Sequence, residues 1–221
     1  MSESSVLTVC LPTATPADQI GAAAAALLAT HGITDARLAS GHFLTRTRWR
    51  AGRLLQPGAG VAAGGPIGLL DLARMRAGLQ QRYGDRWQIW QQVVAGSPAA
   101  RPWWHFYDRY AADPDTYTWE HARHGFASQP RVARMLTYNA HPCRQTDLPT
   151  EHLDAFDAGL QAYATYGWLQ AVPGGRMLTL DGRLLGPGSS RYSVHLEFLG
   201  QANVHLQTLA AGGVLAAFTT G

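Results

Sequence analysis

The chain has 221 residues, 46% of them hydrophobic and 15% charged, so it is long enough to bury a sizeable core. All 18 basic residues are arginine and none is lysine, which excludes most enzymes that need a lysine: P-loop nucleotide hydrolases, protein kinases and pyridoxal-phosphate enzymes. A net charge of +3 permits an anionic partner without requiring one.

Residues 1–55 predict the first β-α-β half of a fold. Residues 6–11 are apolar and rich in β-branched side chains, which is typical of a buried strand. Thr15 and Pro16 then predict the N-cap and the first position of a helix. Residues 33–50 are expected to carry the next strand.

The central part of the chain predicts helices. Residues 56–66 are rich in Gly, Ala and Pro and predict a flexible loop. Residues 67–166 carry apolar side chains at three- and four-residue steps, with an aromatic block at 102–126. They are therefore expected to form a large helical insertion, in which aromatic residues at helical spacing are more typical of core than of a stacking platform.

Residues 167–221 return to β character and complete the fold. Asp181 and Gly182 form a good hairpin turn between two short strands, residues 191–209 predict a helix, and residues 214–219 predict a last strand. This order predicts a single α+β domain with a split β-α-β (ferredoxin-like) sheet and the large helical insertion.

A basic stretch at residues 42–53 is the main candidate for a binding site. Side chains alternate across a strand, so Arg46, Arg48 and Arg50 are expected on one face and Trp49 on the other. Guanidinium groups are costly to bury without acceptors, so that face must meet water, carboxylates of the same chain or an anionic ligand. The predicted ligand-binding residues are Arg46, Arg48, Trp49, Arg50 and Arg53. The alternative is an internal strap of salt bridges to the helical insertion.

Three histidines are candidates for acid–base catalysis: His42, His105 and His121. His105 and Asp108 lie three residues apart on an expected helix and could form a base with its orienting partner, although an ordinary surface pair has the same spacing. The chain has no G-x-S-x-G elbow. A catalytic signature is therefore lacking.

A zinc site is a further alternative. One turn of a helix separates His121 from His124, and His141 and Cys143 follow in an expected loop, so the four could supply nitrogen and sulfur ligands. Their spacing matches no established zinc signature. We therefore expect no cofactor.

The two cysteines, Cys10 and Cys143, form no CxxC pair, and the first residues lack the basic segment of a secretory signal. Reduced thiols and a cytoplasmic location are expected. Cys10 lies in an expected buried strand and should be inert, whereas Cys143 is the more reactive candidate. The alanine-rich run at residues 22–29 is too short to span a membrane, so no membrane partner is expected.

Three short motifs are distributed along the chain: Arg46-Thr47-Arg48-Trp49 before a basic turn, Ala127-Ser128-Gln129-Pro130-Arg131-Val132, and Thr179-Leu180-Asp181-Gly182. Together they resemble a group of proteins from actinobacteria and their phages that has no established activity. In that group two glycines stand where this chain has Arg46 and Thr47, and the apolar last strand ends in residues that this chain lacks. The resemblance supports the expected fold and implies no mechanism.

Three functions follow from these patterns. The first is a non-enzymatic binding or accessory protein whose basic stretch contacts nucleic acid or an acidic protein. The second is a small enzyme that acts on a phosphorylated or carboxylated small molecule in a pocket between the sheet and the helical insertion, where Arg48 would hold the anion. The third is a protein that self-associates as a homo-oligomer and buries surplus aromatic side chains at an interface.

Overall fold

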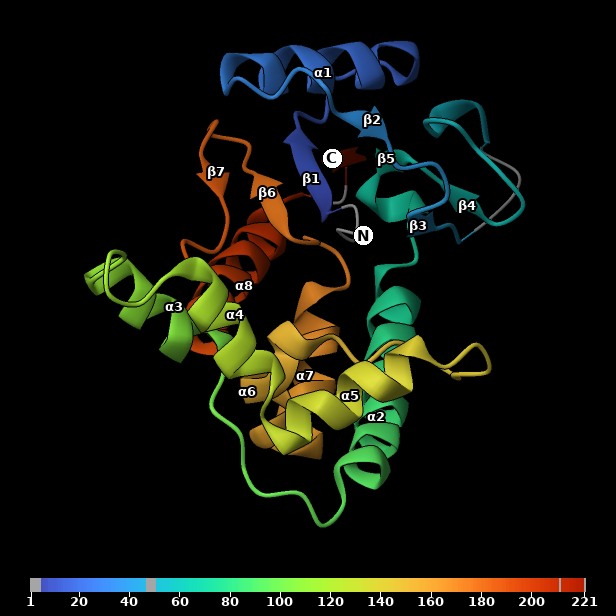
Figure 1. The fold of residues 1–221 in the computed structure, drawn as a ribbon. Coiled ribbons are helices and arrows are strands. Elements are labelled where there is room, and N and C mark those ends of the chain that lie inside the picture. Colours follow the sequence, from blue (N-terminus) through green and yellow to red (C-terminus); the bar gives the residue numbers. More distant parts are fainter. Residues whose placement is uncertain (1–4, 47–50, 211, 221) are drawn as a thin grey trace. The chain divides into compact units, whose positions relative to one another are not determined.

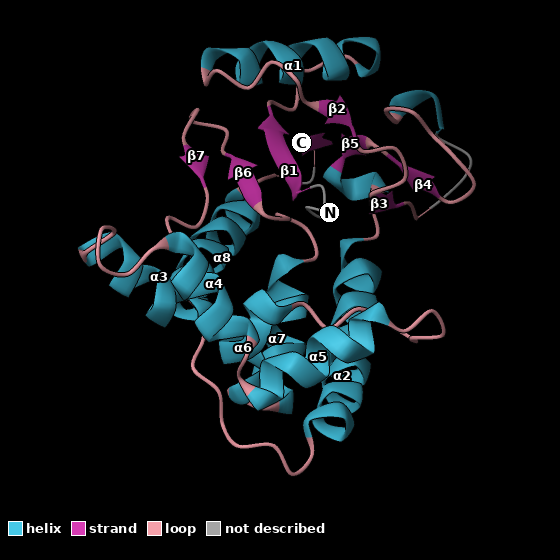
Figure 2. Cartoon of the chain, viewed as in Figure 1, coloured by secondary structure: helices cyan, strands magenta, loops and turns pink. Residues whose placement is uncertain are grey.

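The computed structural model describes residues 5–46, 51–210 and 212–220. Within these residues the chain is a mixed α+β protein with eight α-helices, one mixed six-stranded sheet and a separate two-stranded sheet (Figures 1 and 2). The chain divides into two compact units. The sheet unit comprises residues 1–79, 168–188 and 196–221, and the helical unit comprises residues 80–167 and 189–195.

The sheet unit is built around strand β1 (Ser5–Leu11). β1 pairs antiparallel with β8 (Val214–Thr220) along its whole length and parallel with β6 (Arg176–Leu178) on its other side. β7 (Leu184–Leu185) pairs antiparallel with β6 and closes the hairpin at Asp181-Gly182, as the sequence predicts. The sheet also contains β2 (Arg37–Leu38) and β5 (Gly64–Pro66). The strand order is β2-β8-β1-β6-β7, and β5 also pairs with β8.

The core of the sheet unit follows from the alternation of side chains in β1. Leu7, Val9 and Leu11 are fully buried and pack with one face of helix α1 (Ile20–Thr30), whose Ile20, Ala24 and Leu28 recur at helical spacing. Burying a side chain of this size contributes about 1.5–3 kcal/mol relative to leaving it exposed.

The start of the first helix differs from the prediction. A short 3-10 helix (Ala17–Gln19) precedes α1, and Pro16 is its N-cap. Thr15 does not cap it with its side chain; instead its backbone N–H donates to the Pro12 carbonyl in a turn. Proline supplies no N–H and fixes its own φ, which suits the position before a helical turn.

Residues 33–66 also differ from the prediction. They form β2 (Arg37–Leu38), β3 (Phe43–Leu44), a short 3-10 helix (Ala51–Arg53), β4 (Val61–Ala62) and β5 (Gly64–Pro66). The loop predicted at 56–66 extends only to residue 60; its second half forms β4, which pairs with β3, and β5, which pairs with β8. Gly64 permits the second pairing, since a Cβ there would lie 2.3 Å from the carbonyl oxygen of Leu215.

The helical unit contains some helices in full and parts of others. Its complete helices are α3 (Trp103–Ala112), α4 (Trp119–Ala127), α5 (Pro130–Ala140) and α6 (Leu153–Asp157). Three longer helices contribute segments: α2 (Leu72–Val94), α7 (Leu160–Gln170) and α8 (Tyr192–Thr208). Short 3-10 turns lie at Ile67–Leu69 in the sheet unit and at Thr150–His152 before α6.

The core of the helical unit is aromatic. Phe156 and Tyr163 are fully buried with ring centroids 4.3 Å apart, and Trp90 stacks on Phe156 at 5.1 Å. Gly167 makes room for Tyr83, because a Cβ there would lie 2.6 Å from the Tyr83 ring. The predicted aromatic block at 102–126 contributes little to this core: α3 has no buried residue, Tyr107 and Trp119 are exposed, and Phe126 is the one aromatic residue of the block that is buried.

Candidate functional site

The basic stretch lies only in part within the described residues. Arg48, Trp49 and Arg50 fall outside them. Arg46 is exposed, and its Nε donates to the backbone carbonyl of Leu70 at 3.1 Å. Arg53 is exposed at the end of the short 3-10 helix.

Of the three candidate catalytic histidines, His42 belongs to the sheet unit, and His105 and His121 belong to the helical unit. The Nε2 atom of His42, in the sheet unit, is buried without a hydrogen-bond partner, and burial lowers the pKa of this imidazole to about 4. Nε2 of His105 lies 2.7 Å from Nη1 of Arg101, while Asp108 forms its ion pair with Arg191. The expected His105–Asp108 pair is therefore not formed. His121 is exposed on α4.

The candidate zinc ligands do not form a cluster. His121 and His124 are exposed on α4, and Nδ1 of His141 accepts the backbone N–H of Cys143 at 3.2 Å in the following loop. Among the described residues, no three His, Cys, Asp or Glu side chains are placed so that they could hold one metal ion. The four residues therefore give no support to the zinc alternative.

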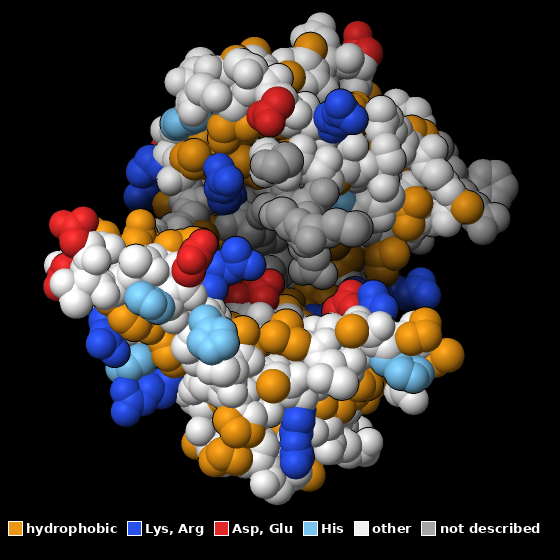
Figure 3. Space-filling view, viewed as in Figure 1, with side chains coloured by type: hydrophobic (Ala, Val, Ile, Leu, Met, Phe, Trp, Pro, Cys, Tyr) orange, Lys and Arg blue, Asp and Glu red, His pale blue; other side chains and the backbone are white. Residues whose placement is uncertain are grey.

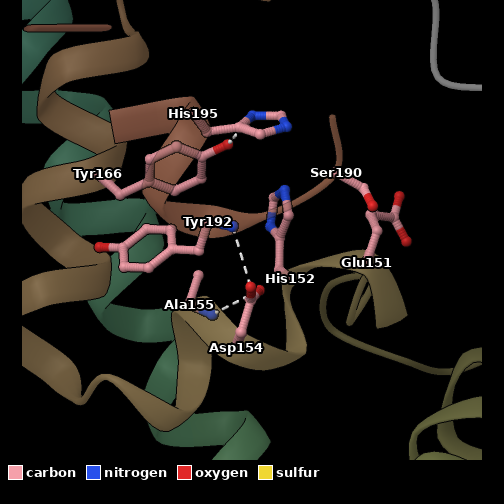
Figure 4. A pocket seen from close by; sticks show the side chains of 8 residues that line it. All are labelled: Glu151, His152, Asp154, Ala155, Tyr166, Ser190, Tyr192 and His195. Carbon is pink, nitrogen blue, oxygen red and sulfur yellow. Dashed lines mark hydrogen bonds between the residues drawn. The ribbon is translucent and has the colours of Figure 1, made fainter. Parts of the chain in front are cut away.

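A pocket that no sequence pattern indicated lies within the helical unit (Figure 4). It has a volume of about 170 Å³. The 3-10 turn before α6, α6 itself, α7 and the first turn of α8 supply its walls. The lining residues are Glu151, His152, Asp154, Ala155, Tyr166, Ser190, Tyr192 and His195.

Asp154 connects several of the elements around this pocket by hydrogen bonds. Its Oδ2 accepts the backbone N–H of Tyr192 at 3.0 Å and the indole N–H of Trp104 at 3.3 Å, and its Oδ1 accepts the N–H of Ala155 at 3.1 Å. Tyr192 is the first residue of α8, where backbone N–H groups lack partners inside the helix and negative charge is favourable. The carboxylate of Asp154 therefore has a structural role at this helix start.

His152 is held in an aromatic surrounding. Its Nδ1 lies 3.0 Å from the hydroxyl of Tyr163, and its ring meets that of Tyr166 edge to face at 5.5 Å. Burial, then the nearby charges of Arg86 and His195, lower the pKa of His152 to about 3. The imidazole is therefore neutral at pH 7.

His195 is positioned in a similar way from α8. Its Nδ1 lies 3.2 Å from the hydroxyl of Tyr166. Burial lowers the pKa of His195, against the opposing effects of the Asp154 charge and of a hydrogen bond to the backbone of Ser189. Burial, followed by the neighbouring tyrosines, raises the pKa of Tyr166, so its hydroxyl keeps its proton. Both histidines are thus paired with protonated tyrosines.

Glu151 and Ser190 form the open side of the pocket. Both are exposed, and both are labelled among the lining residues in Figure 4. In the described part of the chain, the carboxylate of Glu151 forms no ion pair. On the face drawn in Figure 3, acidic and basic side chains are interspersed.

Some of the lining residues lie close together in the sequence. Glu151, His152 and Asp154 all lie in the short stretch after Pro149 and Thr150, so three polar side chains gather around one helix start. The other half of the pocket, from Tyr166 and the stretch 190–195, has no recognisable pattern. Only the packing of α7 and α8 brings it to the same place.

Comparison of the chain with protein-family models, with curated proteins and with solved structures finds no match. No described helix is both long enough and apolar enough to cross a membrane. The pocket and its chemistry are therefore the basis for a functional proposal.

Proposed function

We propose that this protein binds a small molecule in the pocket of the helical unit. The observation that carries the proposal is the pair of neutral imidazoles, His152 and His195, each held by a tyrosine hydroxyl beside a cavity. Because these hydrogen bonds fix the rings before a ligand arrives, little ordering remains to be done on binding.

The pocket dimensions limit the ligand. A volume of about 170 Å³ is smaller than the ~300–1,000 Å³ usual for drug-sized ligands, so the occupant is a small molecule or the end group of a larger one. The lining has two carboxylates, Glu151 and Asp154, and no arginine. This supports a neutral or cationic ligand over the phosphorylated or carboxylated substrate expected from the sequence.

A fragment screen tests the proposal directly. With histidine side chains labelled by ¹⁵N, a bound fragment should shift the NMR signals of His152 and His195. Ser190→Trp should abolish these shifts by filling the open side of the pocket. Thr116→Trp is the matched control, because Thr116 is an exposed residue of the same unit that does not line the pocket. Shifts that survive in Ser190→Trp, or a screen in which no fragment moves either signal, would contradict the proposal.

A second function, contact with an anionic partner through the basic stretch, is favoured by a different observation. Arg46 and Arg53 are exposed, and within the described residues neither forms an ion pair with a carboxylate. This supports an anion-facing surface over an internal strap of salt bridges. The protein would then be a non-enzymatic accessory protein with nucleic acid or an acidic protein as partner.

Its test is binding of a single-stranded oligonucleotide at several salt concentrations. Affinity should fall steeply as salt rises, and the Arg46→Ala, Arg53→Ala double variant should reduce the slope. Arg37→Ala, another exposed arginine of the sheet unit, is the control. Unmeasurable affinity at low salt would end this second proposal.

The ferredoxin-like arrangement of the sheet also stands as a proposal. The position of β8 between β1 and β2, antiparallel to both, supports a split β-α-β unit formed by β1, α1 and β2.

A further inference from the structure

The hydrogen bond between Tyr163 and His152 bears on which nitrogen of His152 carries a proton. The hydroxyl oxygen of Tyr163 lies 3.0 Å from Nδ1 of His152. Burial raises the pKa of this hydroxyl, so it keeps a proton that it can donate to Nδ1. A neutral imidazole has a single N–H, and donation by Tyr163 puts it on Nε2.

The Nε2–H of His152 points into the pocket. Figure 4 shows this ring standing between Tyr166 and Glu151, with its upper nitrogen directed towards His195 and the open space. A ligand that fills the pocket would remove this N–H from water, so a ligand oxygen that accepts it would be bound selectively. The pocket therefore offers a hydrogen-bond donor at its inner end.

The open side of the pocket has the opposite character. The carboxylate of Glu151 lies there without an ion pair among the described residues, and the charge of Asp154 adds to its field. This side suits a positively charged group.

These two ends define one ligand class. We propose that the pocket binds a small amino alcohol, with its ammonium group at the Glu151 carboxylate and its hydroxyl oxygen accepting the Nε2–H of His152. This inference rests on the proposed function, since it names the chemistry of the same pocket. The predicted ligand has a positive charge and a neighbouring hydrogen-bond acceptor, and a simple anion should not bind.

The test compares three probes of similar size on the full-length protein: ethanolamine, ethylamine and acetate. Binding is followed by long-range ¹H–¹⁵N spectra of the labelled imidazoles, which also report the tautomer of each ring. His152 is assigned by its loss in His152→Gln. We expect the Nε2–H tautomer of His152 before any ligand is added.

Ethanolamine should shift the His152 signal, and ethylamine, which lacks the hydroxyl, should bind at least about tenfold more weakly. Glu151→Gln should weaken ethanolamine binding by about tenfold or more. Glu120→Gln is the matched control, because Glu120 is an exposed carboxylate of the same unit outside the pocket. Both positions are exposed, so both variants are expected to fold, and circular dichroism checks this.

The possible failures separate the inference from the proposed function. If other fragments bind, and Ser190→Trp abolishes their binding, while ethanolamine does not bind, the proposed function is supported and the amino alcohol is the wrong ligand class. Acetate binding, equal affinity for ethylamine, or an Nδ1–H tautomer of His152 would each overturn the inference alone. If no probe or fragment binds, both are overturned.

Discussion

The carboxylate of Asp154 accepts the backbone N–H of Tyr192 at 3.0 Å across 38 positions of sequence. The bond joins the start of α6 to the start of α8 inside the helical unit. The same carboxylate accepts the indole N–H of Trp104. A single side chain therefore connects three helices around the pocket.

Replacing Asp154 with Ala should destabilise the protein by about 1–3 kcal/mol, because a helix-end N–H and an indole N–H lose their acceptor. Asp154→Asn should cost less, since one amide oxygen remains to accept. Denaturant unfolding followed by far-ultraviolet circular dichroism measures both. Asp115→Ala, at an exposed position of the same unit, is the control, and an equal loss in both alanine variants would contradict the role of Asp154.

The pH dependence of stability should report His152. In the unfolded chain its imidazole takes up a proton below about pH 6.5, whereas in the fold it stays neutral down to about pH 3. The unfolded state therefore binds more protons in this window, and the free energy of unfolding falls as the pH falls from 6.5 towards 3. His42, with its pKa lowered to about 4 by burial, acts in the same direction.

In His152→Gln the slope of unfolding free energy against pH between 4.5 and 6.5 should decrease by about 1.4 kcal/mol per pH unit. The variant also loses the hydrogen bond to Tyr163, but this lowers the free energy of unfolding by the same amount at each pH and therefore does not change the slope. His121→Gln controls for the loss of an imidazole from the surface. An unchanged slope in His152→Gln would show that His152 is not neutral and buried in the fold.

Two glycines of the sheet unit should respond in opposite ways to alanine. At Gly64 an added Cβ would lie 2.3 Å from the Leu215 carbonyl oxygen, so β5 would have to move away from β8. Gly64→Ala should therefore destabilise by about 2 kcal/mol or more. Gly200 lies exposed within α8 with no atom near an added Cβ, so Gly200→Ala should stabilise by about 0.5–1 kcal/mol. Thermal unfolding of the two variants measures both effects, and destabilisation by both substitutions would contradict the predicted difference between Gly64 and Gly200.

Thiol labelling should distinguish the two cysteines. Cys10 is buried in β1, and burial raises the pKa of its thiol to about 12, whereas Cys143 is exposed. The native protein should react with one equivalent of a thiol reagent, and with two after unfolding. In Cys143→Ser the native reaction should disappear. Rapid labelling of native Cys143→Ser would show that β1 is accessible.

The elements that the sequence predicted well are those with a single, strong local pattern. The strand at residues 6–11, the helix at 191–209 and the strand at 214–219 are confirmed as β1, α8 and β8 with shifts of one residue at their ends. The two strands are short apolar runs, which the structure buries on both faces, and the helix has apolar side chains at helical steps with few β-branched residues. The hairpin at Asp181-Gly182 is confirmed for a similar reason, because Gly182 adopts φ of 81° at the turn.

Glycine-rich segments were predicted poorly. Composition suggested a loop at 56–66, where the structure has β4 and β5. Glycine weakens an isolated strand, and it also lets a neighbouring backbone approach closely. Whether the second effect applies depends on which strand lies beside it, and the local sequence does not contain that information.

The sequence by itself determined an α+β protein with an aromatic helical part, and it excluded most lysine-dependent chemistry. The tertiary structure alone decided the candidate site. His152 and Asp154 lie in a local cluster, but Tyr166, Tyr192 and His195 join them only because α7 and α8 pack beside α6. A pocket formed by side chains from distant segments depends on packing, and packing leaves no fixed spacing in the chain.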